Sequence, residues 1–207
     1  ADNRRHLQDV PPEVRKKITD AGGFVRTYSC DITEYAANDK LAKDVLKEFG
    51  HVDVLINNAG RSIRRSLALS YDRFHDFERT MQLNYFACVR LTMNLLPSMT
   101  ARKDGHVINV SSIGVLTNAP RFSAYVASKA ALDSFSACAS SEFLDKGINF
   151  TTINMPLVRT PMIAPTKMYD SVPTLSPEEA ADLIVKAIIE RPSRVATRLG
   201  IFAATLN

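Results

Sequence analysis

Tyr125 and Lys129 form a Y-x-x-x-K pair within residues 123–132. This segment is rich in alanine and contains no glycine or proline, so we expect it to be helical. Side chains four residues apart lie on one face of a helix, and the phenol and the ammonium can therefore point into the same space. A nearby ammonium favours the phenolate, which lowers the pKa of the tyrosine from its usual value of about 10. Tyr125 can then donate or accept a proton near neutral pH.

A tyrosine and a lysine at this spacing more often share an exposed helix face, but polar residues elsewhere favour an active site. Residues 107–110 are predicted to form a buried strand, and the hydroxyl of Ser112 follows its end, 13 residues before the tyrosine. Further upstream, residues 57–60 close an apolar run, and Asn84 lies within a predicted helix. Alone, Ser112 or Asn84 would be interpreted as a strand-end cap or a helix-face amide.

In this order and at these spacings, the four features resemble the short-chain dehydrogenase/reductase family over about residues 31–160. The resemblance implies an α/β fold, a Rossmann-like doubly wound parallel sheet with helices on both faces. It also implies reduction of a carbonyl group by a nicotinamide cofactor, with the lysine holding the nicotinamide ribose and the asparagine supporting a water. The family's catalytic residues correspond to Asn84, Ser112, Tyr125 and Lys129.

The resemblance also assigns contacts with the cofactor, which we expect to be NADPH, with NADH as the alternative. Asp31 would accept a hydrogen bond from the adenine amino group, assisted by the backbone of Ile32. The alternative is that Asp31 or Thr33 caps the helix that follows. The remaining contacts are assigned to Asn58, Ala59, Gly60, Tyr125, Lys129, Val158 and Thr160.

Hydrophobic periodicity and the glycines and prolines predict the elements that position these residues. The predicted helices are 12–21, 39–49, 76–99, 125–144 and 177–190, the third of which ends or kinks near Pro97. The predicted strands are 24–30, 52–57, 107–110, 148–153 and 194–197. A capping box at 176–179 begins the last helix. Residues 161–175 contain three prolines and are expected to form a loop that covers the substrate.

The amino-acid composition limits the classes of protein to which the chain could belong. The 207 residues, 45% of them hydrophobic, are expected to form a single domain, 1–207. A formal charge of +4 without basic runs interleaved with aromatics argues against nucleic acid as a partner and favours an anionic substrate or cofactor. The sequence contains no run of 18 apolar residues, so we expect no transmembrane segment. The widely spaced Cys30, Cys88 and Cys138 are expected to be buried thiols in the reducing cytoplasm, and the four histidines predict no metal site.

The glycine pattern predicts that part of the domain is missing. The chain has 8 glycines but no G-x-G or T-G-x-x-x-G-x-G, although a dinucleotide-binding fold normally begins with a strand and a glycine-rich turn. That unit should precede Asp31 by several dozen residues. We therefore expect a segment to be absent near residues 10–12, with residues 1–10 coming from before it. A chain made without the unit is the alternative.

Arg61, Arg64 and Arg65 put three guanidinium groups within five residues after a predicted strand end. Ligands bind at this edge of open α/β sheets. Charged runs are usually solvated loops, and that is one interpretation of this one. The other is a clamp for phosphate or carboxylate groups, which match the guanidinium fork, so the three arginines are candidate substrate-binding residues.

Residues 57–65, 71–85 and 155–167 resemble bacterial fatty acyl-CoA reductases. These enzymes form aldehydes from long-chain acyl-CoA with NADPH, either as single domains or as part of a larger two-domain reductase. The resemblance also implies a homo-oligomer assembled through the helices that carry Asn84 and Tyr125; simple packing of these helices on the sheet is the alternative.

Three other functions compete with this interpretation. The first is a general ketoreductase or alcohol dehydrogenase of the same family. A non-catalytic dinucleotide-binding sensor would be expected to lose the tyrosine or the lysine, and the chain keeps both. A hydrolase built on Ser112 lacks an evident base, because His106 lies on the same predicted strand and its spacing gives no evidence of contact.

Overall fold

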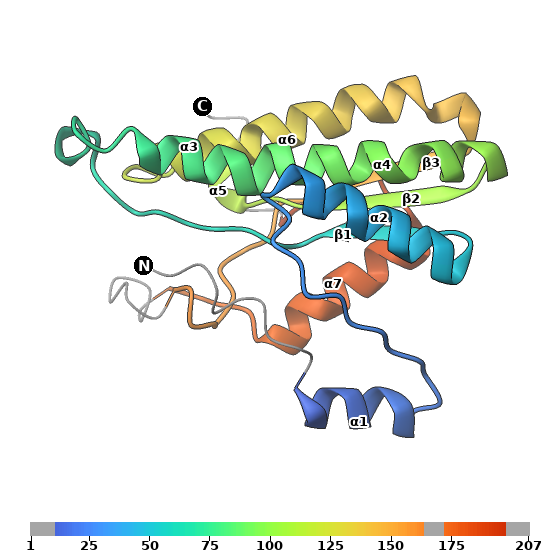
Figure 1. Cartoon of the computed structure of the whole chain (residues 1–207). Helices are drawn as coiled ribbons and strands as arrows, with labels where there is room; N and C mark the ends of the chain where they lie inside the picture. Colours follow the sequence, from blue (N-terminus) through green and yellow to red (C-terminus); the bar gives the residue numbers. More distant parts are fainter. Residues whose placement is uncertain (1–10, 164–171, 198–207) are drawn as a thin grey trace.

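The computed structural model describes residues 11–163 and 172–197, and its centre is a parallel sheet (Figure 1). The strands lie in the order β1-β2-β3-β4. Their bounds are β1 (Val54–Asn57), β2 (Gly105–Val110), β3 (Ile148–Ile153) and β4 (Arg194–Val195). Asn57 pairs with Asn109, and Val110 pairs with Ile153. Because all pairs are parallel, the carboxyl ends of the strands meet at one edge of the sheet.

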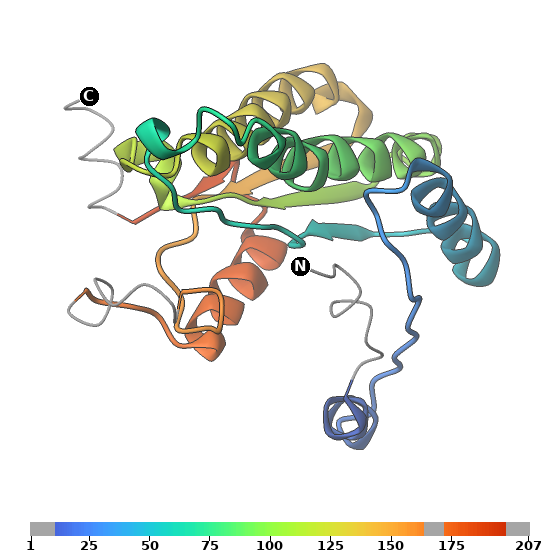
Figure 2. The same ribbon diagram turned by 60° about the vertical axis from the view of Figure 1, so that its left-hand side comes forward.

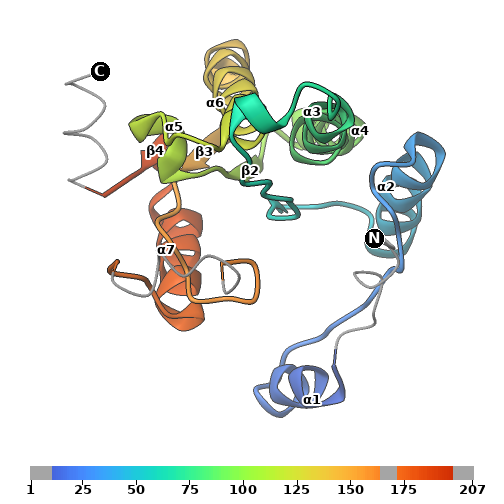
Figure 3. The ribbon, with the colours of Figure 1, turned by 90° about the vertical axis from the view of Figure 1, so that its left-hand side faces the viewer.

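Helices cover both faces of this sheet, as the doubly wound fold predicted. Figure 3 shows α6, α4 and α2 side by side over one face and α7 on the other. The helices are α1 (Pro12–Asp20), α2 (Tyr35–Phe49), α3 (His75–Met81), α4 (Ala87–Arg102), α5 (Ile113–Thr117), α6 (Ser123–Glu142) and α7 (Pro177–Glu190). Short 3₁₀ helices span Leu67–Leu69 and Leu144–Lys146. The predicted capping box is present at Ser176.

Adjacent residues of β2 pack into opposite layers, because side chains alternate across a strand. Val107 lies in a core cluster with Leu55 and Phe150 on the α4 and α6 side. Ile108 lies in a second cluster with Ile153 and with Ala187 of α7. Val107 and Ile108 are fully buried. A strand covered on both faces in this way belongs at the centre of the sheet.

The predicted third helix is longer than expected and contains a π-helical segment. Helical structure runs from α3 through η3, a five-residue π-helix at Gln82–Phe86, into α4, which ends at Arg102. Pro97 lies inside α4, so it does not mark the end of the helix. Asn84 is the central residue of η3 and is fully buried. Local π-helical turns of this kind frequently occur at functional sites.

The prediction of a strand at residues 24–30 is wrong. These residues have no regular structure, and the side chain of Phe24 is 73% exposed. A strand needs a neighbour for its backbone groups, and within the described residues β1 pairs only with β2. Helix α1 has no buried residue and lies apart from the sheet (Figure 2). The expectation about residues 1–10 and most of the predicted substrate loop, 164–171, fall outside the described residues.

The cysteines only partly match the prediction of buried thiols. All three are free, but Cys88 alone is buried, while Cys30 is partly exposed and Cys138 is exposed. Burial raises the pKa of the Cys88 thiol. In the part of the chain that the structure describes, no helix is long and apolar enough to cross a membrane.

The turn before β3 generates a test of the fold. Gly147 has a φ of 73°, and a Cβ there would lie 2.1 Å from the carbonyl oxygen of Lys103. Gly50 has a φ of 78° but nothing within 4 Å of its Cβ position. We expect Gly50→Ala to lower the free energy of unfolding by about 1–2 kcal/mol, the cost of the left-handed backbone. Gly147→Ala should cost about 1–3 kcal/mol more, because it also overpacks the backbone of Lys103.

Urea denaturation of the two variants measures this difference through the midpoint at an unchanged slope. Equal losses of stability in the two variants would contradict the close approach of the two backbone segments.

Candidate active site

The site is built where the strands end. Ser112 lies just beyond β2, the segment 58–60 follows β1, and residues 154–160 follow β3. Helix α6 brings Tyr125 and Lys129 to the same edge, and η3 brings Asn84. The predicted catalytic residues Asn84, Ser112, Tyr125 and Lys129 thus lie on segments that reach this edge of the sheet, and their catalytic roles stay a prediction.

Asn84 holds the backbone that follows Gly60. Its amide nitrogen donates to the carbonyl oxygen of Arg61 at 2.9 Å, and its amide oxygen accepts from the Arg61 N–H at 2.8 Å. The same amide nitrogen donates to the hydroxyl of Ser128 at 2.9 Å. The side chain thus pairs with Arg61 as a neighbouring strand would, and it links that loop to α6.

Gly60 sits against this arrangement. A Cβ at this position would lie 3.3 Å from the amide oxygen of Asn84 and 3.3 Å from the ammonium nitrogen of Lys129. Such a distance is tighter than nine in ten real Cβ contacts, so a larger residue would make one of these two groups shift by a few tenths of an ångström. Glycine allows the close approach without that shift.

Lys129 is almost completely buried, with 3% of its surface exposed. Its Nζ donates to the carbonyl oxygen of Val110, the last residue of β2, at 2.7 Å. Burial lowers the pKa of Lys129, while the nearby Cys88 and Asp133 act in the opposite direction. A lysine kept at the carboxyl end of the central strand places an amine or an ammonium beside the strand edge where ligands bind.

Tyr125 and Ser112 are both half-buried. The backbone carbonyl of Tyr125 accepts from the Ser128 hydroxyl at 2.7 Å, so the Asn84 network extends to the turn that carries the tyrosine. The Ser112 hydroxyl caps α5 and accepts from the N–H of Gly114 at 3.1 Å. Accepting this bond does not use the hydroxyl hydrogen, which Ser112 can still donate to a ligand.

Sequence reasoning missed a second polar network, which holds the backbone of Ser112. Asn154 donates to the Ser112 carbonyl oxygen at 3.4 Å and to the carboxylate of Asp133 at 3.1 Å. Arg194 donates to the same carboxylate at 3.1 Å and to the amide oxygen of Asn154 at 2.5 Å. The available signals were the spacing of Asp133, four residues after Lys129, and an asparagine directly after a strand.

The hydrolase alternative for Ser112 fails on geometry. The Nε2 atom of His106 lies 2.8 Å from the hydroxyl of Thr151, and His106 is in the first half of β2, while Ser112 follows the other end. Burial lowers the pKa of His106 to about 4. His106 is a core residue of the sheet.

Asp31, the predicted adenine contact, closes a turn. Its carboxylate accepts from the N–H of Thr33 at 3.0 Å and from the Thr33 hydroxyl at 2.7 Å. The cap of α2 is Glu34, without a side-chain hydrogen bond, so neither predicted capping residue is correct. Asn38 donates to the Ile32 carbonyl oxygen at 3.0 Å and anchors the turn.

The other predicted cofactor contacts lie along the strand edge. Asn58 and Ala59 are exposed, and the hydroxyl of Thr160 donates to the carbonyl oxygen of Val158 at 3.4 Å. Val158 also forms a parallel bridge with Leu175. The exposed Asn58 and Ala59 leave the backbone after β1 accessible to a flat dinucleotide. The residues present therefore suit a nicotinamide cofactor.

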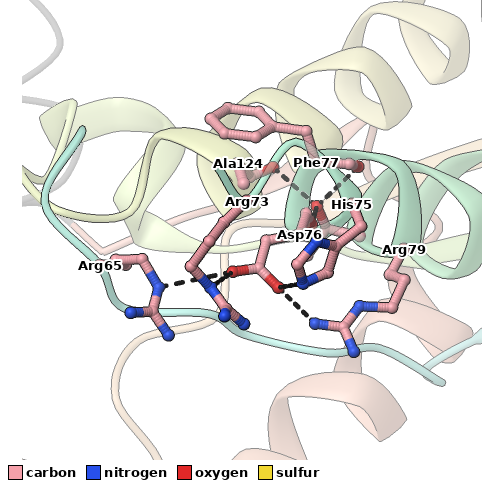
Figure 4. Close-up of polar contacts among 8 residues, drawn as sticks. Arg65, Arg73, His75, Asp76, Phe77, Arg79 and Ala124 are labelled. Carbon is pink, nitrogen blue, oxygen red and sulfur yellow. Dashed lines mark hydrogen bonds and ion pairs between the residues drawn. The ribbon is translucent and has the colours of Figure 1, made fainter. Parts of the chain in front are cut away.

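The three candidate arginines are placed differently from one another. The backbone of Arg61 is held by Asn84, and Arg64 is exposed. Arg65 lies 3.4 Å from the carboxylate of Asp76, which Arg73 and Arg79 also contact (Figure 4). Sequence reasoning missed these two arginines, although both lie three residues from Asp76, a helical spacing that favours ion pairs.

Comparison with known proteins identifies the family. The family model described as short chain dehydrogenase matches residues 6–169. The chain belongs to this family. The predicted Rossmann-like fold and the prediction of an oxidoreductase are thereby confirmed, and the family binds nicotinamide dinucleotides.

Several curated relatives are similar over nearly all of the chain. It is 62% identical over 197 residues to a fatty acyl-CoA reductase of Acinetobacter baylyi, covering 95% of this chain and 67% of that protein. It is 49% identical to a fatty acyl-CoA reductase of Mycobacterium tuberculosis, covering 97% of this chain and 68% of the relative. An uncharacterized oxidoreductase of the same species is 52% identical, with 98% and 59% covered. The chain thus spans about three-fifths to two-thirds of the length of these relatives. The predicted resemblance to bacterial fatty acyl-CoA reductases is confirmed.

Solved structures agree with the family assignment. A short-chain dehydrogenase from Streptomyces avermitilis superposes with a TM-score of 0.79 at 28% identity, covering 94% of this chain and 79% of that one. A 3-ketoacyl-(acyl-carrier-protein) reductase from Brucella melitensis, solved with NADH, gives 0.70 at 25% identity, with 77% and 69% covered.

The Asn84 network can be tested directly. Asn84→Ala removes its three side-chain hydrogen bonds, worth about 0.5–1.5 kcal/mol each. We expect the free energy of unfolding to fall by about 2–4 kcal/mol and the Arg61 amide to exchange its hydrogen with solvent faster. Asn94→Ala is the matched control, because Asn94 also lies on this helical stretch but bonds to Asp39. Unchanged protection of the Arg61 amide in Asn84→Ala would refute the role assigned to Asn84.

Proposed function

We propose that the chain is the reductase domain of an enzyme that converts long-chain fatty acyl-CoA to the fatty aldehyde with NADPH. The observation that carries the substrate is the 62% identity to a fatty acyl-CoA reductase over nearly the whole chain. The site is compatible with this chemistry, because the half-buried Tyr125 and Ser112 and the buried Lys129 belong to segments that reach the edge of the sheet where ligands bind.

Each site residue has a separate task in this proposal. NADPH, when bound, supplies the hydride for the thioester carbonyl carbon. Ser112 donates its hydroxyl hydrogen to the carbonyl oxygen and holds it in place, since its lone pair is already engaged by Gly114. Tyr125 donates the proton as negative charge develops on that oxygen. The Tyr125 phenolate would take this proton back as the carbon–sulfur bond breaks, and the leaving thiolate would take a proton from solvent. The products are the aldehyde, free coenzyme A and NADP⁺.

Lys129 and Asn84 support this proton transfer. Lys129 lies one turn after Tyr125 on α6, and its positive charge would stabilise the phenolate that remains. Asn84 keeps Arg61 and Ser128 in place, and through Ser128 it fixes the turn that carries Tyr125. A positioned side chain of this kind accelerates proton transfer because no reorganisation is needed during the reaction.

The proposed cofactor site follows the edge of the sheet from the Asp31 turn to the segment after β3. Asp31 and the backbone of Ile32 would bind the adenine. Residues 58–60, which follow β1, would allow the cofactor to approach the backbone closely. Val158 and Thr160 would hold the nicotinamide carboxamide. The full set is Asp31, Ile32, Asn58, Ala59, Gly60, Tyr125, Lys129, Val158 and Thr160.

Two further properties belong to the same proposal. The free cysteines support a cytoplasmic location. We also expect a homo-oligomer through the helices that carry Asn84 and Tyr125, supported by the exposed apolar side chains of Phe86 and Met93 beside them. A ketoreductase is the second candidate function, favoured by the structural likeness to the 3-ketoacyl reductase.

Replacing the proton donor tests the proposed function. Tyr125→Phe removes only the hydroxyl, so NADPH oxidation with palmitoyl-CoA should fall by about 10²–10⁴-fold, the usual contribution of general acid catalysis. The affinity for NADPH, measured by fluorescence titration, should stay within about twofold of the wild-type value. A twofold change in affinity is much smaller than the loss of one hydrogen bond to a charged group.

Tyr35→Phe serves as the control, because Tyr35 is exposed on α2 and packs under Arg90. It should behave like the wild type. The full-length protein should also be assayed with ketones: reduction of ketones without reduction of palmitoyl-CoA would favour the ketoreductase. Near-normal turnover of palmitoyl-CoA by Tyr125→Phe would exclude this tyrosine as the proton donor.

A further inference from the structure

A cluster of charged side chains surrounds Asp76 in the first turn of α3 (Figure 4). The residue is 3% exposed. One carboxylate oxygen lies 3.1 Å from Nε of Arg73 and 3.4 Å from Nε of Arg65. The other accepts a hydrogen bond from Nη2 of Arg79 and lies 3.4 Å from Nε2 of His75. We call Arg65, Arg73 and Arg79 with Asp76 the Asp76 cluster.

The Asp76 cluster carries more positive charge than its carboxylate can neutralise. Burial alone would raise the pKa of Asp76, but the hydrogen bonds from Arg79 and Arg73 lower it overall. The carboxylate is therefore ionised at neutral pH, and three guanidinium groups face one negative charge. Two positive charges remain even when His75 is neutral. One arginine would be enough to neutralise a buried carboxylate. Charge balance of the fold therefore does not explain the other two arginines.

The surplus charge faces solvent in a fixed geometry. The arginine side chains are 34–45% exposed, whereas that of Asp76 is 4% exposed. Each guanidinium group has five N–H donors, and one nitrogen of each is the closest to Asp76. Asp76 therefore orients the Arg73 and Arg79 forks by hydrogen bonds and attracts the Arg65 fork by charge alone, and each side chain stays partly accessible. Planar forks held in this way match the oxygens of phosphate groups.

Hydrogen bonds tie the Asp76 cluster to the helix that carries Tyr125. The N–H of Arg65 donates to the carbonyl oxygen of Arg121 at 2.7 Å, just before α6 begins. The hydroxyl of Thr80 lies 3.4 Å from the carbonyl oxygen of Ala124, the residue before Tyr125. An anion bound at the cluster would therefore lie near the proposed active site without contacting the reacting carbonyl.

The cluster is separate from the proposed adenine site. Asp76 lies in the first turn of α3, while Gln82 directly follows the end of this helix and donates to the backbone carbonyl of Thr33, beside Asp31, at 3.0 Å. Asp76 thus lies at one end of α3 and the Asp31 turn at the other, while Arg79 reaches back to Asp76 from the last turn of the helix. An anion at the cluster is then part of the substrate rather than the adenine end of the cofactor.

We propose that the Asp76 cluster binds the phosphate groups of the coenzyme A part of the substrate. This inference rests on the proposed function, because a thioester of coenzyme A carries phosphates well away from its reacting carbonyl. It adds Arg73 and Arg79 to the candidate substrate residues and gives Asp76 a positioning role. It also distinguishes Arg65, which is oriented by Asp76, from the exposed Arg64.

The test compares two thioesters of one fatty acid in the full-length protein. Palmitoyl-CoA carries the phosphates, and palmitoyl-pantetheine lacks all of them. For Arg73→Gln and for Arg79→Gln, each of which leaves two arginines beside Asp76, the ratio of the KM for palmitoyl-CoA to that for palmitoyl-pantetheine should rise about tenfold. This corresponds to one hydrogen bond to a charged group, reduced by solvent screening. The rise should shrink as the salt concentration increases.

Arg90→Gln is the matched control. Arg90 pairs with Asp39 through two hydrogen bonds and is 39% exposed, but it lies on α4 away from the Asp76 cluster. Its KM ratio should equal that of the wild type. An unchanged ratio in Arg73→Gln and Arg79→Gln would overturn the proposal and leave the cluster with a structural role only.

Calorimetric titration with coenzyme A gives a readout that does not need turnover. Wild-type protein should bind coenzyme A, and each variant should bind it about tenfold more weakly, again the value of one screened charged hydrogen bond. Titration with 3′-dephospho-coenzyme A separates the 3′-phosphate from the diphosphate. Failure of the proposed function would appear as reduction of ketones without either thioester. Failure of this inference would appear as coenzyme A binding that the variants do not change, or as no binding at all.

Discussion

The pairing of the Asn84 side chain with the backbone of Arg61 is the interaction on which the site depends. This pairing fixes the loop after Gly60, and the Asn84 amide also bonds to Ser128, which bonds to the turn of Tyr125. The Asn84 amide oxygen lies 3.3 Å from the Cβ position of Gly60, which also faces Lys129. The five-residue π-helix around Asn84 explains how an amide in the middle of a long helix is positioned for this pairing. One side chain therefore sets the relative positions of three segments that are far apart in the sequence.

The protein treats its buried charges in two ways. Lys129 is buried and directed at the end of the central strand by one carbonyl oxygen, so its charge acts inside the site. Asp76 is buried as well, but it lies beneath three partly exposed arginines, so the excess charge acts on the surface. The first arrangement suits proton transfer at a reacting carbonyl, and the second suits recognition of a distant anion. A reductase for acyl-CoA needs both tasks at neighbouring places.

Most strands, and the segments that carry the proposed catalytic residues, could be predicted from the sequence, because local signals define them. The apolar runs that became β1, β2 and β3 and the polar residues at their ends carry the site. The prediction of a strand at residues 24–30 was wrong, because an alternating pattern of side chains does not supply the pairing partner that a strand requires. Likewise the hydrogen bond of Asn154 with Asp133 and the contact of Arg65 with Asp76 join side chains brought together by folding. A π-helix has no sequence pattern distinct from that of an α-helix, so the position of Asn84 within it could not be foreseen.

In the proposed reaction, hydride passes from NADPH to the thioester carbon at the edge of the sheet that carries Ser112, Tyr125 and Lys129. The most direct measurement supplies the full-length protein with palmitoyl-CoA and NADPH labelled with deuterium at the transferring position of C4. We expect one deuterium on the aldehyde carbon and one coenzyme A thiol released for each NADPH oxidised. Oxidation of NADPH without thiol release, or aldehyde that carries no deuterium, would contradict the proposed reaction.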